Sequence, residues 1–590
     1  MRLRLTLSTG RPWRVAPVDV SPGVPAGVGP LTALLEISDK SLTLTWRNEG
    51  TRTVRDVAAG LLLELPTDDA YVTIPGVLYN GNPSSDPALE VPRSGFVCEE
   101  HRLPIPAVNA AWDGQYVTLY AQPVARRAAD GTVAYGSLGI LDGPVIAAMS
   151  GVIMFDGRPD VCYTSKAETT PMEIGYADLA PGASITSRYR LDTGRVEPRG
   201  FGFRALVKEA VAEEGARPLT IAEIIRLKAN ALDARWDPAG GYLAYASPTR
   251  PRPRTFLYGW TGQCLKLAWC DARLGRPDRA FAAAEFYVSG SGTPVPGLRH
   301  GRYLLDEERW AMFDRKGQPF VSSRAYGETI ADLALLAEEF GEWTEAVVEA
   351  AEFFWRHGGI LPLGWTPSGT PVPGPEGAAG IPCARAMLGA HRLTGDKVWL
   401  RRAAELVAAY HRRHAETFER PFAHATLDAS GEDKEAGMAY FEAVTELFQL
   451  TGDDRYARWA EAAADWLLTF VYTWSPEFDA DSTFHRRGFK ASGWPAVSVQ
   501  NHHLDVFFPT AELRHFGLAT GNDRYVAAAD RIMHALGQGI CREPGDWGFA
   551  TPGEQGEGFF QTNWQRKGEA NTWNPSWVIA LPLYHALRWD

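Results

Sequence analysis

Acidic side chains recur in this sequence at positions where a helix is expected to begin. One stretch reads Asp433-Lys434-Glu435-Ala436-Gly437, and Glu442, seven residues after Glu435, falls on the same helical face. An acid within an apolar helix needs an explanation, and Gly437 would let a ligand approach the backbone. The structural alternative is that Asp433 caps the helix and Glu435 meets its positive end. Asp433 and Glu435 are therefore our first candidates for acids that exchange a proton with a ligand.

A second acid lies one turn into another expected helix, in the stretch Ser322-Ser323-Arg324-Ala325-Tyr326-Gly327-Glu328. Asp332 follows Glu328 by four residues and shares its face. Arg324 precedes Glu328 by four residues, so a structural Arg–Glu pair is the alternative reading. We predict a site role for Glu328, with Arg324 and Tyr326 as ligand-binding neighbours.

The densest polar cluster is Gln500-Asn501-His502-His503-Leu504-Asp505, which we expect at the start of a third helix. On a helix, His502 and Asp505 would lie three residues apart, so the carboxylate could orient an imidazole. The alternative is that a histidine here only caps or hydrogen-bonds. No HExxH pattern or third ligand accompanies the pair, so we expect no metal, and nothing in the sequence requires another cofactor.

Tryptophans in loops with Gly, Pro or Asn form a further group of candidates. The chain has 20 Trp, and a large protein buries many of them as core. Loop tryptophans can also stack on flat apolar ligand faces, since pockets favour aromatic linings. The expected ligand-binding residues are Arg324, Tyr326, Trp260, Trp310, Arg385, Gln500, Asn501, His502, His503, Trp494, Glu569, Asn571 and Trp573, beside the candidate catalytic acids Glu435, Asp433, Glu328 and Asp505.

These residues must be positioned by a repeat of helix pairs. From about residue 218 onward, helix-length apolar segments break at similar turns, Thr394-Gly395-Asp396, Thr451-Gly452-Asp453 and Thr520-Gly521-Asn522. A helix–turn–helix unit that recurs every ~50–70 residues predicts a helical array or ring. The more charged, outer helices are expected at 219–232, 277–289, 343–357, 397–414, 454–473 and 523–539. The more apolar, inner helices are expected at 260–273, 325–339, 380–393, 434–450, 501–519 and 575–588, and they would gather their N-terminal ends around one cavity.

Residues 1–200 show strand patterns instead, with short β-branched or alternating segments between Gly, Pro, Asn and Asp clusters. This spacing predicts an antiparallel β-sandwich. We therefore expect a β-sandwich domain at 1–200, a linker at 201–217 with a short helix, and an (α/α)6-barrel catalytic domain at 218–590, which makes the fold a multidomain β plus α chain.

A β-sandwich followed by six helix pairs with such turns and Trp-rich loops resembles the six-hairpin glycosidase superfamily. The resemblance covers most of the chain but is architectural, and the exact family is open. It implies a glycoside hydrolase, in which one carboxylic acid protonates the leaving oxygen and a second carboxylate acts on water, with inversion as the usual outcome. Glu435 or Glu328 would be the acid and Asp433 or Asp505 the base, and nearby arginines hint at substrates that contain uronic acid.

Three alternatives stay open. A lyase that acts on uronates would use a His or Tyr base, from His502, His503 or Tyr326, with Arg324 or Asn501 on the carboxylate. A sugar epimerase and a non-catalytic carbohydrate-binding protein are the others. An unsaturated product would separate the lyase from the hydrolase.

Composition limits the remaining classes. A net charge of −12 argues against a nucleic-acid partner, since phosphate contacts need a basic face. No segment reaches the ~20 apolar residues of a membrane span. The N-terminus lacks the apolar stretch of a signal peptide, so we expect a cytoplasmic protein. The six cysteines form no CxxC pair. A carbohydrate substrate is the expected partner, and a homo-oligomer is left open.

Overall fold

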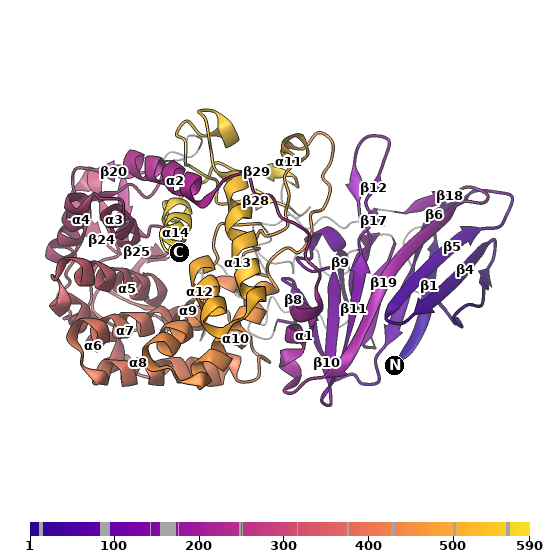
Figure 1. Ribbon diagram of the computed structural model, residues 1–590, viewed down its shortest axis with the longest axis horizontal. Coiled ribbons are helices and arrows are strands. Elements are labelled where there is room, and N and C mark those ends of the chain that lie inside the picture. Colours follow the sequence, from indigo (N-terminus) through magenta and orange to yellow (C-terminus); the bar gives the residue numbers. More distant parts are fainter. Residues whose placement is uncertain are drawn as a thin grey trace.

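The computed structural model describes the chain from Met1 to Asp590 except residues 11–15, 83–94, 142, 151, 154–172, 175, 247–248, 250–251, 316, 375–376, 426–430, 500–502 and 562–566. Strands fill one end of the molecule and helices the other, and α1 (Gly202–Glu209) lies between them (Figure 1).

Two large antiparallel sheets form the N-terminal part. The seven-stranded sheet contains β2 (Pro17–Val18), β1 (Arg2–Thr9), β6 (Val54–Glu64), β15 (Val145–Met149), β14 (Ser137–Leu141) and β9 (Gly95–Glu99) in spatial order, with β18 (Ala177–Leu179) also on β6. The eight-stranded sheet runs β3 (Ala26–Val28), β4 (Leu31–Ser38), β5 (Ser41–Asn48), β19 (Ser184–Arg195), β11 (Gln115–Gln122), β10 (Ala107–Trp112), β7 (Tyr71–Ile74) and β8 (Leu78–Tyr79).

Alternation along these strands places apolar side chains in one shared core. Leu42, Leu44 and Trp46 of β5 are buried while the residues between them are not. Leu61 and Leu63 of β6, in the other sheet, belong to the same hydrophobic cluster. A strand with period-two burial presents one face to a core and the other outward. The outer face of the eight-stranded sheet is therefore free to meet α1 and the helical part.

Helices form at all twelve predicted positions of the C-terminal part, with shifted ends. The outer helices are α2 (Ile221–Arg235), α4 (Pro277–Gly290), α6 (Thr344–His357), α8 (Lys397–Tyr410), α10 (Asp454–Leu468) and α13 (Asp523–Leu536). The inner helices are α3 (Cys264–Arg273), α5 (Ser323–Phe340), α7 (Pro382–Thr394), α9 (Lys434–Thr451), α12 (Thr510–Thr520) and α14 (Trp577–Ala586). A short α11 (Thr483–Arg487) and several two- to five-residue strands, such as β24 (Arg309–Ala311) and β26 (Gln318–Ser322), lie in the connections.

The repeated turns explain why one helix stops and the next starts. Gly395, Gly452 and Gly521 end their helices in the left-handed conformation, with φ of 69°, 66° and 67°. Glycine adopts this conformation without steric cost. The next residue caps the following helix: the Asp453 carboxylate accepts from the backbone N–H of Arg455 at 2.8 Å. The T-G-D motif is thus a helix stop followed at once by a helix start.

The inner helices close on themselves. Helix α3 contacts α5, α5 contacts α7, α7 contacts α9, α9 contacts α12, α12 contacts α14, and α14 returns to α3. Figure 1 shows α14 within the ring of the other helices. Side chains at the starts of α5 and α9 consequently meet near the ring's axis.

Two inner helices begin later than predicted. Helix α3 starts at Cys264, because Trp260 and Gln263 have positive φ. Helix α12 was expected from residue 501 but starts at Thr510, so the prediction of helix was wrong for the described residues 503–509. Pro509 disfavours helix at the residue before it, and the Asp505 carboxylate accepts from the N–H of Phe507 at 3.1 Å, which fixes a turn. The proposed helical spacing of His502 and Asp505 therefore does not apply, and His502 lies outside the described residues.

The strand-rich and helical parts are joined by hydrogen bonds. The Tyr472 hydroxyl donates to the carbonyl of Arg102 at 3.0 Å and the Trp474 indole donates to the carbonyl of Leu103 at 2.9 Å. The loop at Gly76 and Tyr79 packs against the end of α10, where the Tyr79 and Thr469 hydroxyls are 2.6 Å apart. In the part of the chain that the structure describes, no helix is long and apolar enough to cross a membrane.

Candidate active site

Two glutamates on the inner helices α5 and α9 share one guanidinium group. Arg324, in the first turn of α5, donates from Nε to Oε1 of Glu328 at 2.8 Å. Its Nη1 lies 2.5 Å from Oε2 of Glu435, in the first turn of α9. The Arg324 side chain is 10% exposed, that of Glu328 is 20% exposed and that of Glu435 is 2% exposed. Arg324 thus holds two carboxyl groups beside each other, that of Glu328, which is partly exposed, and that of Glu435, which is buried.

Glu328 is fixed from a second side by the loop before α3. Its Oε2 accepts from the backbone N–H of Trp260 at 2.6 Å and from the side-chain amide of Gln263 at 2.7 Å. With Arg324 on Oε1, three donors surround this carboxylate. Donors on both oxygens fix the position and orientation of this carboxylate.

The loop that supplies these donors has an unusual backbone. Trp260 and Gln263 adopt positive φ values of 43° and 52°, which non-glycine residues adopt at a cost of about 1 kcal/mol or more. Gly259, also at positive φ, leaves no room for a side chain, because a Cβ there would stand 2.0 Å from the carbonyl oxygen of Ala325. The loop is therefore pressed directly onto the start of α5, and strain of this kind clusters at functional sites.

The start of α9 is held by a second set of buried charges. Asp433 caps the helix, since its Oδ1 accepts from the N–H of Glu435 at 3.0 Å. The Lys434 ammonium is fully buried and donates to Oδ1 of Asp505 at 2.7 Å and to the carbonyl of Phe507. Asp433 and Asp505 are fully buried as well. These contacts fix the helix start that presents Glu435.

The same surroundings shift proton affinities. Burial raises the pKa of Glu435 to about 8; Arg324 opposes this rise, while the carboxylates of Asp433 and Asp505 add to it. Burial also raises the pKa of Asp505 to about 6, against the opposing charge of Lys434. The surroundings thus favour the neutral form of Glu435 more strongly than that of Asp505.

Other predicted residues lie deeper in the ring. The Asp332 carboxylate pairs with the ammonium of Lys266 at 2.6 Å, and burial raises its pKa. Arg385 pairs with Glu442 at 2.7 Å and with Glu446 at 3.2 Å. Arg385 and Glu442 are thus engaged with each other rather than with the two glutamates on Arg324.

The rings of the predicted aromatic residues pack against other side chains rather than lining the site. Tyr326 is buried between α5 and α6, where it donates its hydroxyl to the carbonyl of Gly297 and packs on Phe354. Trp494 is fully buried against Phe559. Trp310 lies on β24 in an aromatic cluster rather than in a loop. Trp260 alone among these touches the site, through its backbone.

The remaining predictions fall at the rim or outside the description. The Glu569 carboxylate accepts from the N–H of Thr483 at 3.0 Å, beside α11. The side-chain oxygen of Asn571 accepts from the N–H of Trp573, whose ring stacks on Tyr245. His503 is buried near Phe560. Gln500, Asn501 and His502 lie outside the described residues.

Two buried lysines, Lys434 and Lys266, were missed by the sequence reasoning. The available signal was a lysine inside an otherwise apolar inner helix, since buried lysines are nearly always paired. Among the described residues, no group of three or more His, Cys, Asp or Glu side chains is arranged to hold a metal ion.

Comparison with solved structures finds matches at low sequence identity. No family model and no curated protein matches it. A polysaccharide lyase matches with 13% identity and a TM-score of 0.45, over 99% of this chain and 92% of that one. A D-mannose isomerase matches with 12% identity and a TM-score of 0.46, over 62% of this chain and 96% of that one. An unsaturated glucuronyl hydrolase from Bacillus sp. GL1 matches with 13% identity and a TM-score of 0.39, over 62% and 94%. None of these similarities assigns an activity, so the function is argued from the site.

Proposed function

We propose that the protein is a glycoside hydrolase in which Glu435 is the general acid and Glu328 the carboxylate base. The observation that carries the proposal is the pair of carboxyls on Arg324, one buried with its pKa raised to about 8, the other partly exposed and surrounded by donors. Cleavage of a glycosidic bond needs these two states side by side.

Glu435 suits the acid role because it keeps its proton at neutral pH. In the reaction, that proton moves to the glycosidic oxygen as the bond between this oxygen and the anomeric carbon breaks. A general acid works best when its pKa lies near the working pH. The Arg324 contact holds the carboxyl in place while burial keeps it neutral.

Glu328 suits the base role because three donors stabilise its charge and its side chain is the most exposed of the four candidate acids. It accepts a proton from water as the water oxygen bonds to the anomeric carbon. The sequence favoured Asp433 or Asp505 for this role. Both are fully buried; Asp433 caps α9, and Asp505 pairs with Lys434 and accepts from the N–H of Phe507.

A specific contact makes hydrolysis preferable to elimination. A lyase needs a group that neutralises the substrate's carboxylate. Arg324, the described cation between the two glutamates, is already bound to both of them. Tyr326, a predicted lyase base, donates its hydroxyl to a backbone carbonyl in the core.

The proposed architecture is the one that the resemblance implies: a β-sandwich at 1–200, a linker at 201–217 and an (α/α)6 barrel at 218–590 of the six-hairpin glycosidase type. The closed ring of inner helices and the shared core of the two sheets support it. The proposed substrates are oligosaccharides, including those that contain uronic acid, cleaved with inversion.

The test is a panel of aryl glycosides and uronate oligosaccharides, read for released reducing sugar and for absorbance of unsaturated product. Glu435→Gln and Glu328→Gln should each lower kcat/KM by about 10²–10⁴-fold. Glu338→Gln is the matched control, because Glu338 lies on the same helix as Glu328 and pairs with Arg392 at 2.6 Å away from the site. Unsaturated product, or unchanged rates in both variants, would overturn the assignment.

A further inference from the structure

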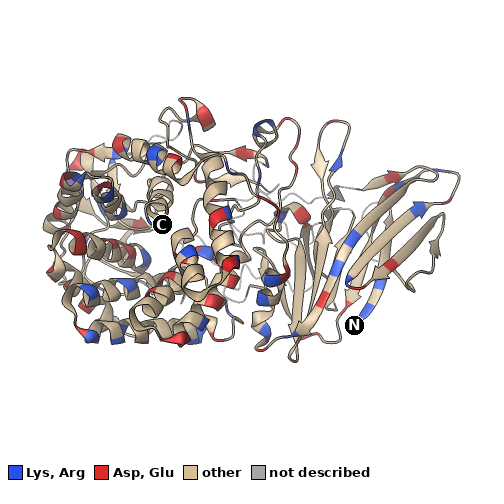
Figure 2. Cartoon of the chain, in the orientation of Figure 1, with Lys and Arg blue, Asp and Glu red and all other residues tan. Residues whose placement is uncertain are grey.

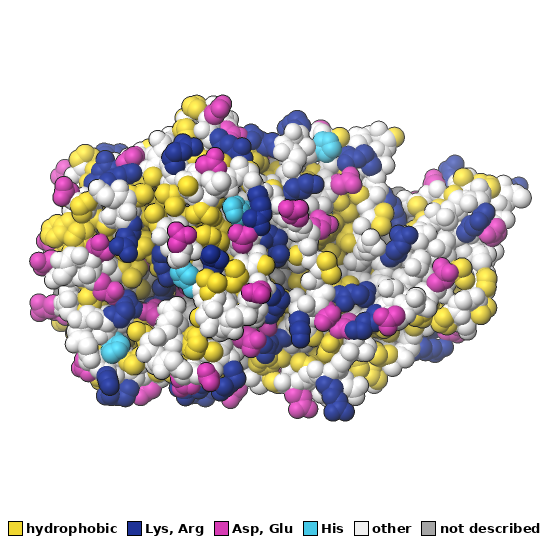
Figure 3. Space-filling view, viewed as in Figure 1, with side chains coloured by type: hydrophobic (Ala, Val, Ile, Leu, Met, Phe, Trp, Pro, Cys, Tyr) yellow, Lys and Arg dark blue, Asp and Glu magenta, His cyan; other side chains and the backbone are white. Residues whose placement is uncertain are grey.

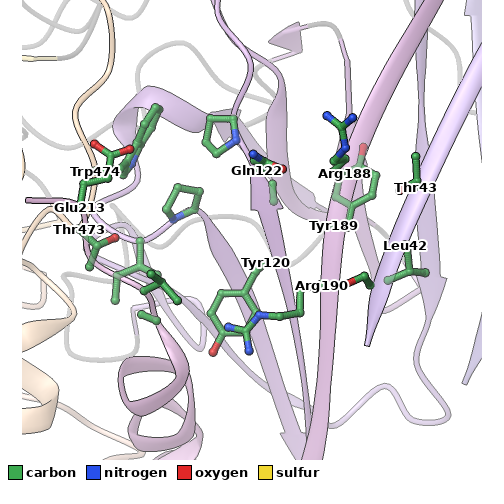
Figure 4. A pocket seen from close by; sticks show the side chains of 17 residues that line it. Leu42, Thr43, Tyr120, Gln122, Arg188, Tyr189, Arg190, Glu213, Thr473 and Trp474 are labelled. Atoms are coloured by element: carbon green, nitrogen blue, oxygen red, sulfur yellow. The ribbon is translucent and has the colours of Figure 1, made fainter. Parts of the chain in front are cut away.

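A cavity of about 500 Å³ lies between the outer face of the eight-stranded sheet and the segment at Thr473 and Trp474. It begins where α1 ends, because the Tyr120 hydroxyl donates to the carbonyl of Leu206, and Arg190 donates to that of Glu209. Figure 4 shows Glu213, Thr473 and Trp474 on one side of this cavity and Thr43 and Arg188 on the other. Its size matches that of sites for small ligands.

The pairing of β5, β19 and β11 places two rows of side chains on the sheet face that lines the cavity. Arg188 of β19 lies opposite Thr43 of β5 and Gln122 of β11. Arg190 lies opposite Ser41 and Tyr120 on the same two strands. Residues that face each other across strands lie ~5 Å apart on one face of the sheet. All six line the cavity.

Arg188 stands out within this floor. Arg190 is engaged, since its guanidinium lies 4.1 Å over the Tyr120 ring and pairs with Glu209. Arg188 is exposed, and among the described residues its side chain has no hydrogen bond or ion pair. Figure 2 shows basic and acidic positions following one another along β19. The next acid on this face, Asp192, pairs with Lys40 at 2.5 Å in the following row.

The remaining lining combines hydrogen-bonding groups with apolar walls. Ser41, Thr43, Gln122 and Thr473 offer hydroxyl or amide groups, and Glu213 accepts from the N–H of Ser475 at 2.9 Å. Ile105, Pro106, Pro123 and Val211 form the apolar side, and Val211 is 86% exposed. Alternating hydroxyl partners and apolar walls suit a sugar ring, and a guanidinium suits a carboxylate.

We propose that this cavity is a second saccharide-binding site, separate from the active site, that holds a uronate residue through Arg188. The choice of a sugar rests on the proposed function, whereas the carboxylate follows from Arg188 itself. The site would hold an acidic oligosaccharide on the sheet while its chain is processed in the ring.

The test is hydrogen–deuterium exchange of the whole protein with a tetrasaccharide of alternating glucuronate and N-acetylglucosamine, and with cellotetraose as the neutral probe. The acidic probe should protect β5, β11 and β19 around Thr43, Gln122 and Arg188. In Arg188→Ala, about tenfold more of the acidic probe should be needed to reach the same protection. Arg195→Ala, an exposed arginine later on β19 and outside the cavity lining, should leave it unchanged.

Protection that is absent, equal for both probes, or unchanged in Arg188→Ala would overturn the proposal. Aryl-glycoside hydrolysis, measured in parallel, should be unaffected by Arg188→Ala. If hydrolysis is absent but the acidic probe protects the sheet, the second site stands and the proposed function fails. If hydrolysis occurs without protection of the sheet, the reverse holds.

Discussion

Replacing Asp433 with Asn should lower the pKa of Glu435, the proposed catalytic acid, while keeping the helix start that presents it. The Asp433 carboxylate raises the pKa of Glu435, and its Oδ1 also caps α9. Asparagine accepts the same hydrogen bond and is an equally good capping residue. The substitution therefore removes a negative charge next to Glu435 and keeps an acceptor for the cap of α9.

The size of the effect follows from the contacts. A neighbouring like charge shifts a carboxyl pKa by about 1 unit or more, which corresponds to about 1.4 kcal/mol. Glu435 loses activity when it deprotonates, so its pKa of about 8 sets the basic limb of the pH–rate profile. In Asp433→Asn this limb should move down by about 1 pH unit.

The assay is kcat/KM against pH with a phenyl glycoside, because a poor leaving group makes the reaction depend on the acid. Asp453→Asn is the matched control, since Asp453 caps α10 in the same way, far from Arg324. A limb that stays in place or moves up would refute Glu435 as the titrating acid. In Glu435→Gln the limb should disappear.

Three further outcomes follow from the described contacts. Glu435 is protonated in the folded protein up to a pKa of about 8 but titrates near 4.5 when unfolded, so its contribution to stability falls as pH rises through that window. Glu435→Gln should therefore reduce the pH dependence of the free energy of unfolding by up to about 1.4 kcal/mol per pH unit. The measurement is the difference in Tm between acidic and neutral buffers for the two proteins. An identical pH dependence in both would contradict the raised pKa. Gln263→Leu removes one donor from Glu328 and should lower kcat/KM about tenfold, with an unchanged Tm to show that the fold is intact; a full rate would exclude this donor from catalysis. Arg235 is fully buried and bound to Glu554 through two 2.8 Å contacts, so Glu554→Leu should destabilise by about 3–5 kcal/mol, whereas Arg235→Met with Glu554→Leu should recover much of the loss in a denaturant titration.

The helices could be predicted from sequence because their signals are local. Gly452 and Asp453 stop one helix and start the next within two residues, whatever the rest of the chain does. The start of α12 was misplaced because the stretch before Thr510 begins with polar residues and continues with apolar ones, as a helix start does. Pro509 disfavours helix at the residue before it, and the prediction did not take this into account.

Charge is mixed across the surface, as the composition indicates: Figure 3 shows acidic and basic side chains intermingled on the face in view.

The site could be predicted only in part, because its decisive contacts join distant segments. The sequence could propose Glu328 and Glu435 as candidates, since each stands near a helix start. Nothing in the spacing could show that Arg324 reaches both of them, or that the backbone of Trp260 closes on Glu328. Choosing between acid and base depends on burial, which is a property of the assembled ring.

The structural and functional readings of Arg324 turn out to be compatible. The sequence offered either an ordinary i, i+4 pair with Glu328 or a ligand-binding cation. The expected pair does form, but the same guanidinium also reaches Glu435 on α9, beyond α7 in the ring. A group that only stabilised α5 would need no second carboxyl partner in the most buried part of the site. Two carboxyls of different proton affinity at one cation are what the proposed acid–base cleavage requires, so the contact that joins the starts of α5 and α9 would also serve the proposed chemistry.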